Sequence, residues 1–231
     1  MKRSLINHLI DEAIEFAKEQ GLALPPFAYW GVKEWEEADC SYQEIVDNML
    51  GWDATDFGQG DFMKAGLVTF TFRNGNFNHK DLYPKPYAEK LLLVEDGQEL
   101  PYHFHWSKME DIINRGGGNL VLTLYNSDEQ EGFADTDDAV KIDGRSVVIP
   151  AGGKVTLHPG ESITLKQGQY HRWVGEKGTG KVMLFEVSMT NDDFVDNRFY
   201  VPQDRIPEVD EDEEIRHLIF ADYKKYFGKG K

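Results

Sequence analysis

A change in the spacing of apolar residues limits the folds that are open to this chain. From Leu67 onward, apolar and polar residues alternate in short runs separated by turn-forming residues, and the pattern continues for well over a hundred residues. Alternation with a period of two is typical of strands with one buried face. It predicts nine strands: Leu67–Arg73, Ala88–Val94, Leu100–Trp106, Leu120–Tyr125, Val140–Ile142, Ser146–Ile149, Ser162–Leu165, His171–Val174 and Lys181–Met189. Asp143-Gly144 is the clearest hairpin turn, and so many short strands favour a β-sandwich or barrel.

The region before these strands has a different pattern. Apolar residues between Met1 and Gly21 recur at helical spacing, which predicts an amphipathic helix that begins at Ser4 and ends at Gly21. Residues 35–50 show a second, weaker helical pattern. We therefore expect residues 1–66 to form a helical and aromatic collar on a barrel formed by residues 67–231, all within one structural domain.

The C-terminal part of the chain forms an extension of this barrel. Residues 208–214 are strongly acidic, and such a run is most often a solvated segment. Residues 217–227 are expected to add a short closing helix.

The charge balance narrows the class of partner. The chain has 41 acidic and 25 basic residues, a formal charge of −16, which opposes binding to nucleic acid and to anionic membranes. Cys40 is the only cysteine, and a reducing compartment is the simpler interpretation. With neither a secretion signal nor a membrane-spanning run in the sequence, we expect a soluble, cytoplasmic protein whose partner is neutral or cationic. Exposed strand edges and aromatic strands favour a homodimer.

Three histidines and one glutamate form the clearest candidate site. His103 and His105 are two residues apart on a predicted strand, so their side chains share one face. A tight turn can return Glu110 to the same place, and a facing strand can deliver His171. Three imidazoles and a carboxylate suit manganese, iron, cobalt, nickel or zinc better than calcium or magnesium. The spacing therefore predicts one divalent metal ion.

The same residues resemble the signatures of the cupin superfamily. The first signature is met in full, from Gly97 through the two histidines and Glu110 to Gly117. The second keeps Gly160, Gly168 and His171 but has Lys166 where proline is usual and Gly175 where asparagine is usual. The resemblance implies a cupin double-stranded β-helix, a jelly-roll barrel that is dominated by β-strands, here with an N-terminal helical extension.

A more specific resemblance covers nearly the whole chain. The runs LPPFAYW (24–30), DNMLGWD (47–53), PKPYAEK (84–90), YHFHWSKMEDIINRGGG (102–118), EVS (186–188), NDD (191–193) and DNRF (196–199) are similar to the D-lyxose ketol-isomerase family of cupins. Members interconvert D-lyxose and D-xylulose, often accept D-mannose and D-fructose, and typically use manganese. The resemblance implies a metal-dependent aldose–ketose isomerase that works through metal-bound O1 and O2 and an enediol, although a direct hydride shift stays open.

Such a reaction needs acid–base groups near the metal. Lys108 lies between His105 and Glu110 and could stabilise or protonate the sugar oxygens, although a lysine on a turn can also be a surface residue. Glu186 and Glu208 are the candidates for the base.

Four further residues are candidates for contacts with the sugar. Lys90 stands in an apolar run, where it either points into the barrel or pairs with Glu89. Asp192, Asp196 and Arg198 could bind hydroxyl groups, although the NDD run is also an ordinary turn, and the resemblance favours Asp196 and Arg198.

Two other functions would fit the same metal site. A cupin dioxygenase would use iron or nickel and bind O₂ in the open positions. A sugar-binding cupin without turnover would bind the aldose and form no ketose.

Overall fold

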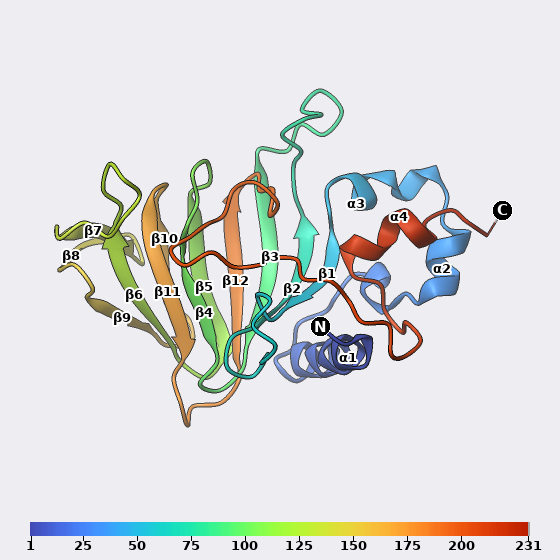
Figure 1. Ribbon diagram of the computed structural model, residues 1–231, viewed down its shortest axis with the longest axis horizontal. Helices are drawn as coiled ribbons and strands as arrows, with labels where there is room; N and C mark the ends of the chain where they lie inside the picture. The colour runs from blue at the N-terminus through green and yellow to red at the C-terminus, as the bar shows by residue number, and fades with distance from the viewer. Residues whose placement is uncertain (231) are drawn as a thin grey trace.

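The alternating residues from Leu67 onward form two antiparallel sheets, shown in Figure 1 for the computed structural model, which describes residues 1–230. The larger sheet has eight strands in the order β1-β2-β3-β12-β5-β10-β7-β8, and the smaller has five in the order β13-β4-β11-β6-β9. Apolar side chains from both sheets meet in one core, which includes Leu92 and Ile112 from the larger sheet and Leu122 and Trp173 from the smaller. The expected cupin barrel with an N-terminal helical extension is confirmed.

The strands are β1 (Gly51–Thr55), β2 (Leu67–Arg73), β3 (Tyr87–Val94), β4 (Glu99–Phe104), β5 (Glu110–Gly117), β6 (Leu120–Asn126), β7 (Asp138–Ile142), β8 (Arg145–Ile149), β9 (Lys154–Leu157), β10 (Ser162–Leu165), β11 (Gln169–Gly175), β12 (Val182–Met189) and β13 (Arg198–Phe199). The helices are α1 (Arg3–Glu19), α2 (Val32–Glu37), α3 (Gln43–Asp47) and α4 (Tyr223–Tyr226), with 3₁₀ turns η1 (Pro26–Tyr29), η2 (Cys40–Tyr42) and η3 (Phe220–Asp222).

All nine predicted strands are present, with bounds that differ by no more than two residues. The predicted hairpin is also present, because Asp143 and Gly144 join β7 to β8 with φ angles of 47° and 79°. Strands β1, β5, β9 and β13 were not predicted. In β5, the buried positions include Glu110, Asn114 and Gly116, so the alternation of burial is not an alternation of hydrophobicity.

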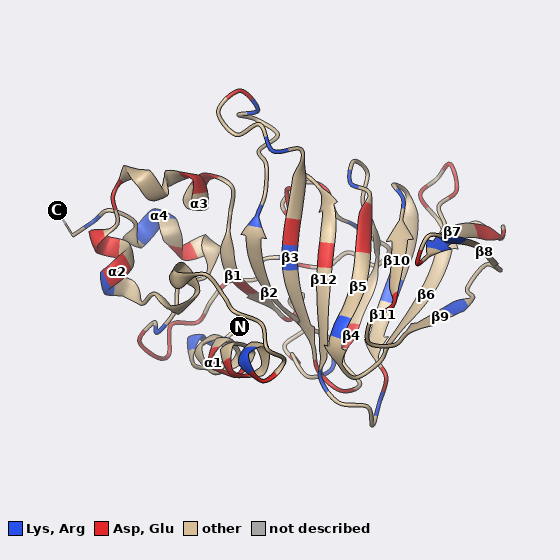
Figure 2. Ribbon diagram, turned by 180° about the vertical axis from the view of Figure 1, so that it is seen from behind, with Lys and Arg blue, Asp and Glu red and all other residues tan. Residues whose placement is uncertain are grey.

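The side chains of the central strands point alternately into and out of the barrel. On β3, Leu91 and Leu93 face outward and pack with the apolar side of α1, which carries Ile6 and Ile10. Their neighbour Leu92 faces inward and belongs to the core between the sheets. Figure 2 shows charged positions on β3, β12 and β5. A charged side chain at an inward-facing position of one of these strands therefore lies inside the barrel.

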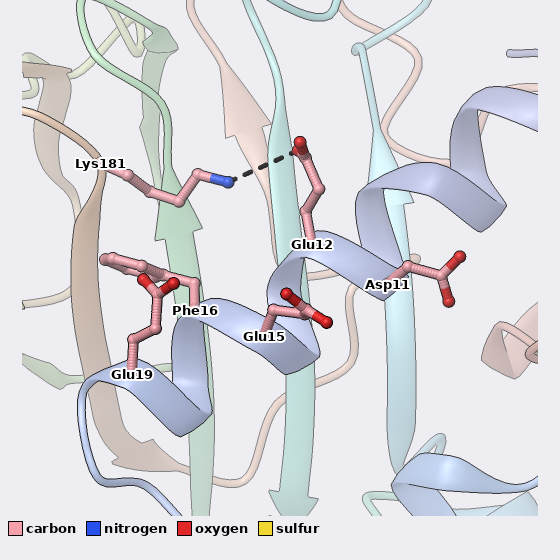
Figure 3. Close-up of a pocket in the computed structure, with 6 residues that line it drawn as sticks. All are labelled: Asp11, Glu12, Glu15, Phe16, Glu19 and Lys181. Atoms are coloured by element: carbon pink, nitrogen blue, oxygen red, sulfur yellow. Dashed lines mark ion pairs between the residues drawn. The ribbon is translucent and has the colours of Figure 1, made fainter.

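The opposite side of α1 faces solvent. Figure 3 shows four carboxylates, from Asp11 to Glu19, spread along this side beside Phe16 and Lys181. Lys181 lies 3.7 Å from Glu12 and 2.7 Å from Glu95. The carboxylates do not converge on one point, as expected of a solvated helix surface. Within residues 1–230, no helix has both the length and the hydropathy of a membrane span.

The collar is joined to the barrel, and the C-terminal extension to the collar, more closely than the sequence indicated. Residues 51–55 lie in the predicted collar, yet β1 pairs with β2 and continues the larger sheet. The predicted helix over residues 35–50 is divided into α2, η2 and α3, with the Asp39 carboxylate capping η2 through the backbone N–H of Ser41. The closing helix is shorter than expected and consists of η3 and α4, whose Tyr223 packs on Trp35.

The acidic segment over residues 208–214 is not simply solvated, contrary to expectation. Arg3, which has no solvent exposure, binds Glu211 from this segment and Asp222 from η3, with Nη2 at 2.9 Å from each carboxylate. The expected helix start at Ser4 was also wrong. The N-cap is Lys2, and the N–H and hydroxyl of Ser4 donate to the Asp212 carboxylate instead. A buried guanidinium requires carboxylate partners, which explains why the acidic run contacts α1.

Replacing Arg3 with methionine should destabilise the fold by about 3–5 kcal/mol, because Glu211 and Asp222 would lose a buried partner. Chemical denaturation measures this change directly. Lys2→Met is the matched control, since Lys2 is exposed and lies 3.6 Å from Asp212, and it should shift the free energy of unfolding by no more than about 0.5 kcal/mol. Equal effects of the two substitutions would contradict a structural role for the acidic segment.

Candidate functional site

Two paired strands bring the three histidines together. His103 on β4 lies directly opposite His171 on β11, and their ring centroids are 4.1 Å apart. His105 follows β4 on the same side, with its ring centroid 5.0 Å from that of His103. All three are buried, and their ligand nitrogens lie within 4.8 Å of one another. The smaller sheet therefore supplies a set of three convergent imidazoles.

Backbone carbonyl groups fix the orientation of all three rings. The Nδ1 atoms of His103, His105 and His171 lie 2.9, 2.8 and 3.0 Å from the carbonyl oxygens of Pro101, Asp196 and Gln169, respectively. A carbonyl oxygen only accepts, so each Nδ1 carries the proton and donates it. Each neutral ring then presents the lone pair of Nε2. This arrangement is typical of histidines that bind a metal.

Glu110 enters the same space from the larger sheet. Its Oε1 atom lies 3.2 Å from Nε2 of His171 and 3.4 Å from Nε2 of His105. Neither Oε1 of Glu110 nor Nε2 of His171 has a hydrogen-bond partner in the described chain, although both are buried. Because Nδ1 of His171 carries the proton, Nε2 of His171 is a hydrogen-bond acceptor. It faces a second acceptor, Oε1 of Glu110. Only a cation, or a protonated imidazole, would make the contact favourable, so the residues fit a metal ion.

The charge states that a metal requires are also favoured. Burial lowers the pKa of His103 well below its usual value, and the neighbouring His171 and His105 lower it further, which keeps the ring neutral. Burial alone would raise the pKa of Glu110, but Lys108 and His105 outweigh it and hold the pKa well below its usual range. The site thus offers a neutral imidazole at His103 and an ionised carboxylate at Glu110.

Lys108 connects the Glu110 carboxylate to Glu186. Its Nζ atom lies 2.8 Å from Oε2 of Glu110 and 2.8 Å from Oε1 of Glu186, and its side chain is 2% exposed. Burial lowers the pKa of Lys108, but the two carboxylates raise it above the ordinary value. Glu186 lies on β12 and also accepts the hydroxyl of Ser188 at 2.8 Å. Lys108 is therefore a buried ammonium ion beside the candidate metal site, not a surface lysine.

A second ion-pair network lies beside the first. Lys90 is opposite Glu186 across β3 and β12, points into the barrel, and lies 3.2 Å from Asp193. Glu89, the alternative partner, pairs with Arg73 on the outside. Asp193 also binds Arg205 at 2.9 Å. The sequence contains no local sign of this contact, because Asp193 and Arg205 stand among residues typical of turns and are separated from Lys90 by more than 100 positions.

Three other residues that the sequence predicted for the site, Asp196, Arg198 and Glu208, do not join the groups around the three histidines. The Asp196 side chain accepts the N–H of Ser107, and its backbone carbonyl orients His105, so it supports the turn that carries the ligands. Arg198 pairs with Glu131 at 2.7 Å. The Glu208 carbonyl accepts the N-terminal amino group of Met1. The structure does not bring Arg198 or Glu208 to the cavity beside the histidines.

That cavity, which we call the inner cavity, has a volume of about 40 Å³ and lies between the two sheets. Residues 190–209, which we call the strap, cross the front of the sheet in Figure 1 and contribute part of its wall. The strap is held by hydrogen bonds from Tyr200 to Tyr102 and from Asp204 to Phe57. The imidazoles and charged groups of the lining are His103, His105, Lys108, Glu110, Glu186, Lys90, Asp193 and Arg205.

Solved structures with a similar fold include sugar isomerases. The L-ribose isomerase of Cellulomonas parahominis, solved with L-ribose, superposes with a TM-score of 0.60 over 91% of this chain and 98% of that one. The L-ribose isomerase of Geodermatophilus obscurus gives the same TM-score and coverage. Both are 14% identical to this chain, so the similarity concerns the fold.

Sequence comparison gives a closer relationship. The D-lyxose/D-mannose isomerase of Escherichia coli O157:H7 is 44% identical over 227 residues, which cover 98% of this chain and all of the relative. The D-lyxose/D-mannose isomerase of Serratia proteamaculans is 43% identical over 227 residues, 98% of this chain and 99% of the relative. The sequence model of the D-lyxose isomerase family matches residues 1–223. The chain therefore belongs to the D-lyxose isomerase family of sugar isomerases.

Proposed function

We propose that this protein is a metal-dependent isomerase that interconverts D-lyxose and D-xylulose, and also D-mannose and D-fructose. The substrates come from the names of its relatives. The observation that carries the metal dependence is the pair of buried acceptors, Oε1 of Glu110 and Nε2 of His171, which face each other at 3.2 Å. The neutral aldose agrees with the strongly acidic composition of the chain.

In this proposal, His103, His105, His171 and Glu110 hold one divalent cation, and manganese is the metal we expect, with cobalt, zinc, iron and nickel as alternatives. When bound, such a cation supplies Lewis acidity that polarises the sugar carbonyl and stabilises negative charge on oxygen. Three imidazoles and one carboxylate leave the ion with a net positive charge. The carbonyl oxygens behind the imidazoles keep the rings in place without using the ligand nitrogens.

Glu186 is the base in this account. Lys108 and Lys90 keep its carboxylate ionised, because they offset the effect of burial and lower its pKa. The carboxylate removes the proton from C2 of the aldose and returns it to C1, while a second proton moves from O2 to O1. Lys108 stays charged and lowers the energy of the negative oxygen that develops in the enediolate. Glu186 and Lys108 thus divide proton transfer and charge stabilisation between them.

Lys90 and Asp193 are positioned to bind sugar hydroxyl groups further from the metal. Both line the inner cavity, and their ion pair provides a donor and an acceptor at one point. Asp196 positions His105 and the turn after it. A direct role for Arg198 or Glu208 would require the strap to move when sugar binds, since neither lines the cavity in this conformation.

The test is a reaction in which the manganese-loaded protein is incubated with D-lyxose, D-mannose or D-ribose without oxygen. NMR spectra of the products should show D-xylulose from D-lyxose and D-fructose from D-mannose. Sugar binding without any ketose would contradict the proposal and favour a binding protein. A requirement for O₂ would favour a dioxygenase.

A further inference from the structure

The chain has a second and larger hollow outside the inner cavity. This outer groove has a volume of about 530 Å³ and lies between α3, the loop that follows β2, the strap and the segment from η3 to α4. Residues that characterise it are Asn48, Asn76, Asn191, Asp192, Phe194 and Phe220. Its size falls within the range of small-molecule sites, about 300–1,000 Å³.

The lining of the outer groove suits a neutral molecule with hydroxyl groups. Asn191 is 3% exposed, and its Nδ2 atom donates to Asp193 at 2.7 Å, while its Oδ1 atom has no hydrogen-bond partner in the described chain. A buried acceptor of this kind lacks a donor, which a hydroxyl group would supply. The rings of Phe194 and Phe220, 6.0 Å apart, provide an apolar surface beside it.

The charges of the groove argue against an anionic ligand. Its lining has the carboxylates of Asp47 and Asp192, against the ammonium group of Lys224 and the imidazole of His79. Without an excess of positive charge, a phosphorylated sugar would gain little from binding here. The groove therefore fits an unmodified sugar better than a sugar phosphate.

A small polar cavity, which we call the throat, lies between the outer groove and the inner cavity. The throat has a volume of about 10 Å³. It shares Met49, Asn191 and Phe220 with the outer groove, and Lys90 and Asp193 with the inner cavity. Asn191 thus lies on the side of the outer groove, and the ion pair between Lys90 and Asp193 lies on the side of the inner cavity.

The inner cavity, the throat and the outer groove differ in volume, and this difference indicates different roles. The inner cavity, at about 40 Å³, has room for only a few water molecules in this conformation, whereas the outer groove can hold a sugar. Asp193 belongs to the strap and Lys90 to β3, so separation of this pair would widen the throat and the inner cavity together.

From these contacts we propose that the outer groove is the vestibule in which a neutral sugar first binds, and that the throat closed by Lys90 and Asp193 is its route to the metal site. The inference rests on the proposed isomerase function for the identity of the sugar. It assigns Asn191 to a hydroxyl group of the waiting sugar.

Two adjacent lysines allow a matched test. Lys224 and Lys225 are both exposed on α4, but only Lys224 lines the outer groove. Lys224→Trp should obstruct the groove and lower kcat/KM for D-lyxose at least about tenfold, with kcat and bound manganese within about twofold of wild type. Ala221→Trp, a second exposed position in the lining, should do the same. Lys225→Trp removes the same charge and should leave kcat/KM unchanged. Wild-type kcat/KM in both blocked variants would overturn the proposal.

A readout without turnover separates this proposal from the isomerase assignment. D-Arabinitol is a neutral pentitol that has no carbonyl group to isomerise, and the manganese-loaded protein should accelerate relaxation of its protons by bringing them near the ion. If wild type forms no ketose, the isomerase assignment fails. The relaxation measurement then still tests whether the outer groove is the vestibule. A loss in Lys224→Trp and Ala221→Trp but not in Lys225→Trp supports it, and equal relaxation in all four proteins overturns it.

If both blocked variants unfold, crystals of the wild-type protein soaked in D-arabinitol decide the question. A polyol hydrogen-bonded to Oδ1 of Asn191 supports the vestibule. An outer groove without polyol, in crystals where the groove is open to solvent, overturns it.

Discussion

Replacing His171 with alanine is expected to remove the bound metal and to lower ketose formation from D-lyxose at least about 10³-fold. Within residues 1–230, Nε2 of His171 has no hydrogen-bond partner and faces Glu110, so the substitution removes one of the two buried acceptors from which we infer the cation. Elemental analysis should find about one metal ion per wild-type chain and nearly none per variant chain. Circular dichroism should show that the barrel is retained.

His158→Ala is the matched control for this experiment. His158 is an exposed histidine of the same chain, and its ring contacts the Asn119 side chain at 3.0 Å, far from the metal ligands in the fold. Metal content and turnover should match the wild type. A His171→Ala protein that keeps both its metal and its activity would show that the ion is bound elsewhere.

Glu186→Gln is expected to lower kcat about 10²- to 10⁴-fold while leaving the metal content unchanged. Glutamine preserves the shape of the side chain and an acceptor for Lys108 and Ser188, but it cannot remove a proton from carbon. In deuterated water, wild type should incorporate solvent deuterium into the product, and the variant should incorporate it correspondingly more slowly. The reason is that Glu186 is an ionised carboxylate of the inner cavity, held by Lys108 beside the candidate metal site.

Glu89→Gln controls for the loss of a carboxylate in the same sheet. Glu89 is adjacent to Lys90 on β3 but faces outward, where it pairs with Arg73 at 2.8 Å. Its replacement should leave kcat within about twofold, as for most surface changes. If Glu186→Gln retains wild-type turnover, another group is the base. If wild type incorporates no deuterium although it is active, a hydride shift is the better mechanism.

The candidate metal site could be located from the sequence because its geometry is largely local. His103 and His105 share a face by the periodicity of a strand, and one turn connects them to Glu110. Only His171 comes from a distant segment, and its position opposite His103 follows from antiparallel pairing of β4 with β11. The spacing and the types of these four residues thus predicted which side chains come together, and the family resemblance added the reaction.

The ion pairs around the metal site could not be predicted in the same way. Lys90 in an apolar strand indicates a buried charge that needs a carboxylate, but the sequence does not reveal which of 41 acidic residues supplies it. The partner proved to be Asp193, in a run of residues that is equally typical of a solvated turn. The same limit explains the acidic segment at 208–214, whose contact with Arg3 depends on the folded arrangement of both termini.

Titration of the metal-free protein with Mn²⁺, with D-lyxose isomerisation followed at each point, measures whether activity requires one bound ion per chain. We predict no ketose without metal, a linear rise in activity with added manganese, and a plateau at one ion per chain. Full activity of the metal-free protein, or stoichiometric manganese binding that produces no ketose from any aldose tested, would contradict the account.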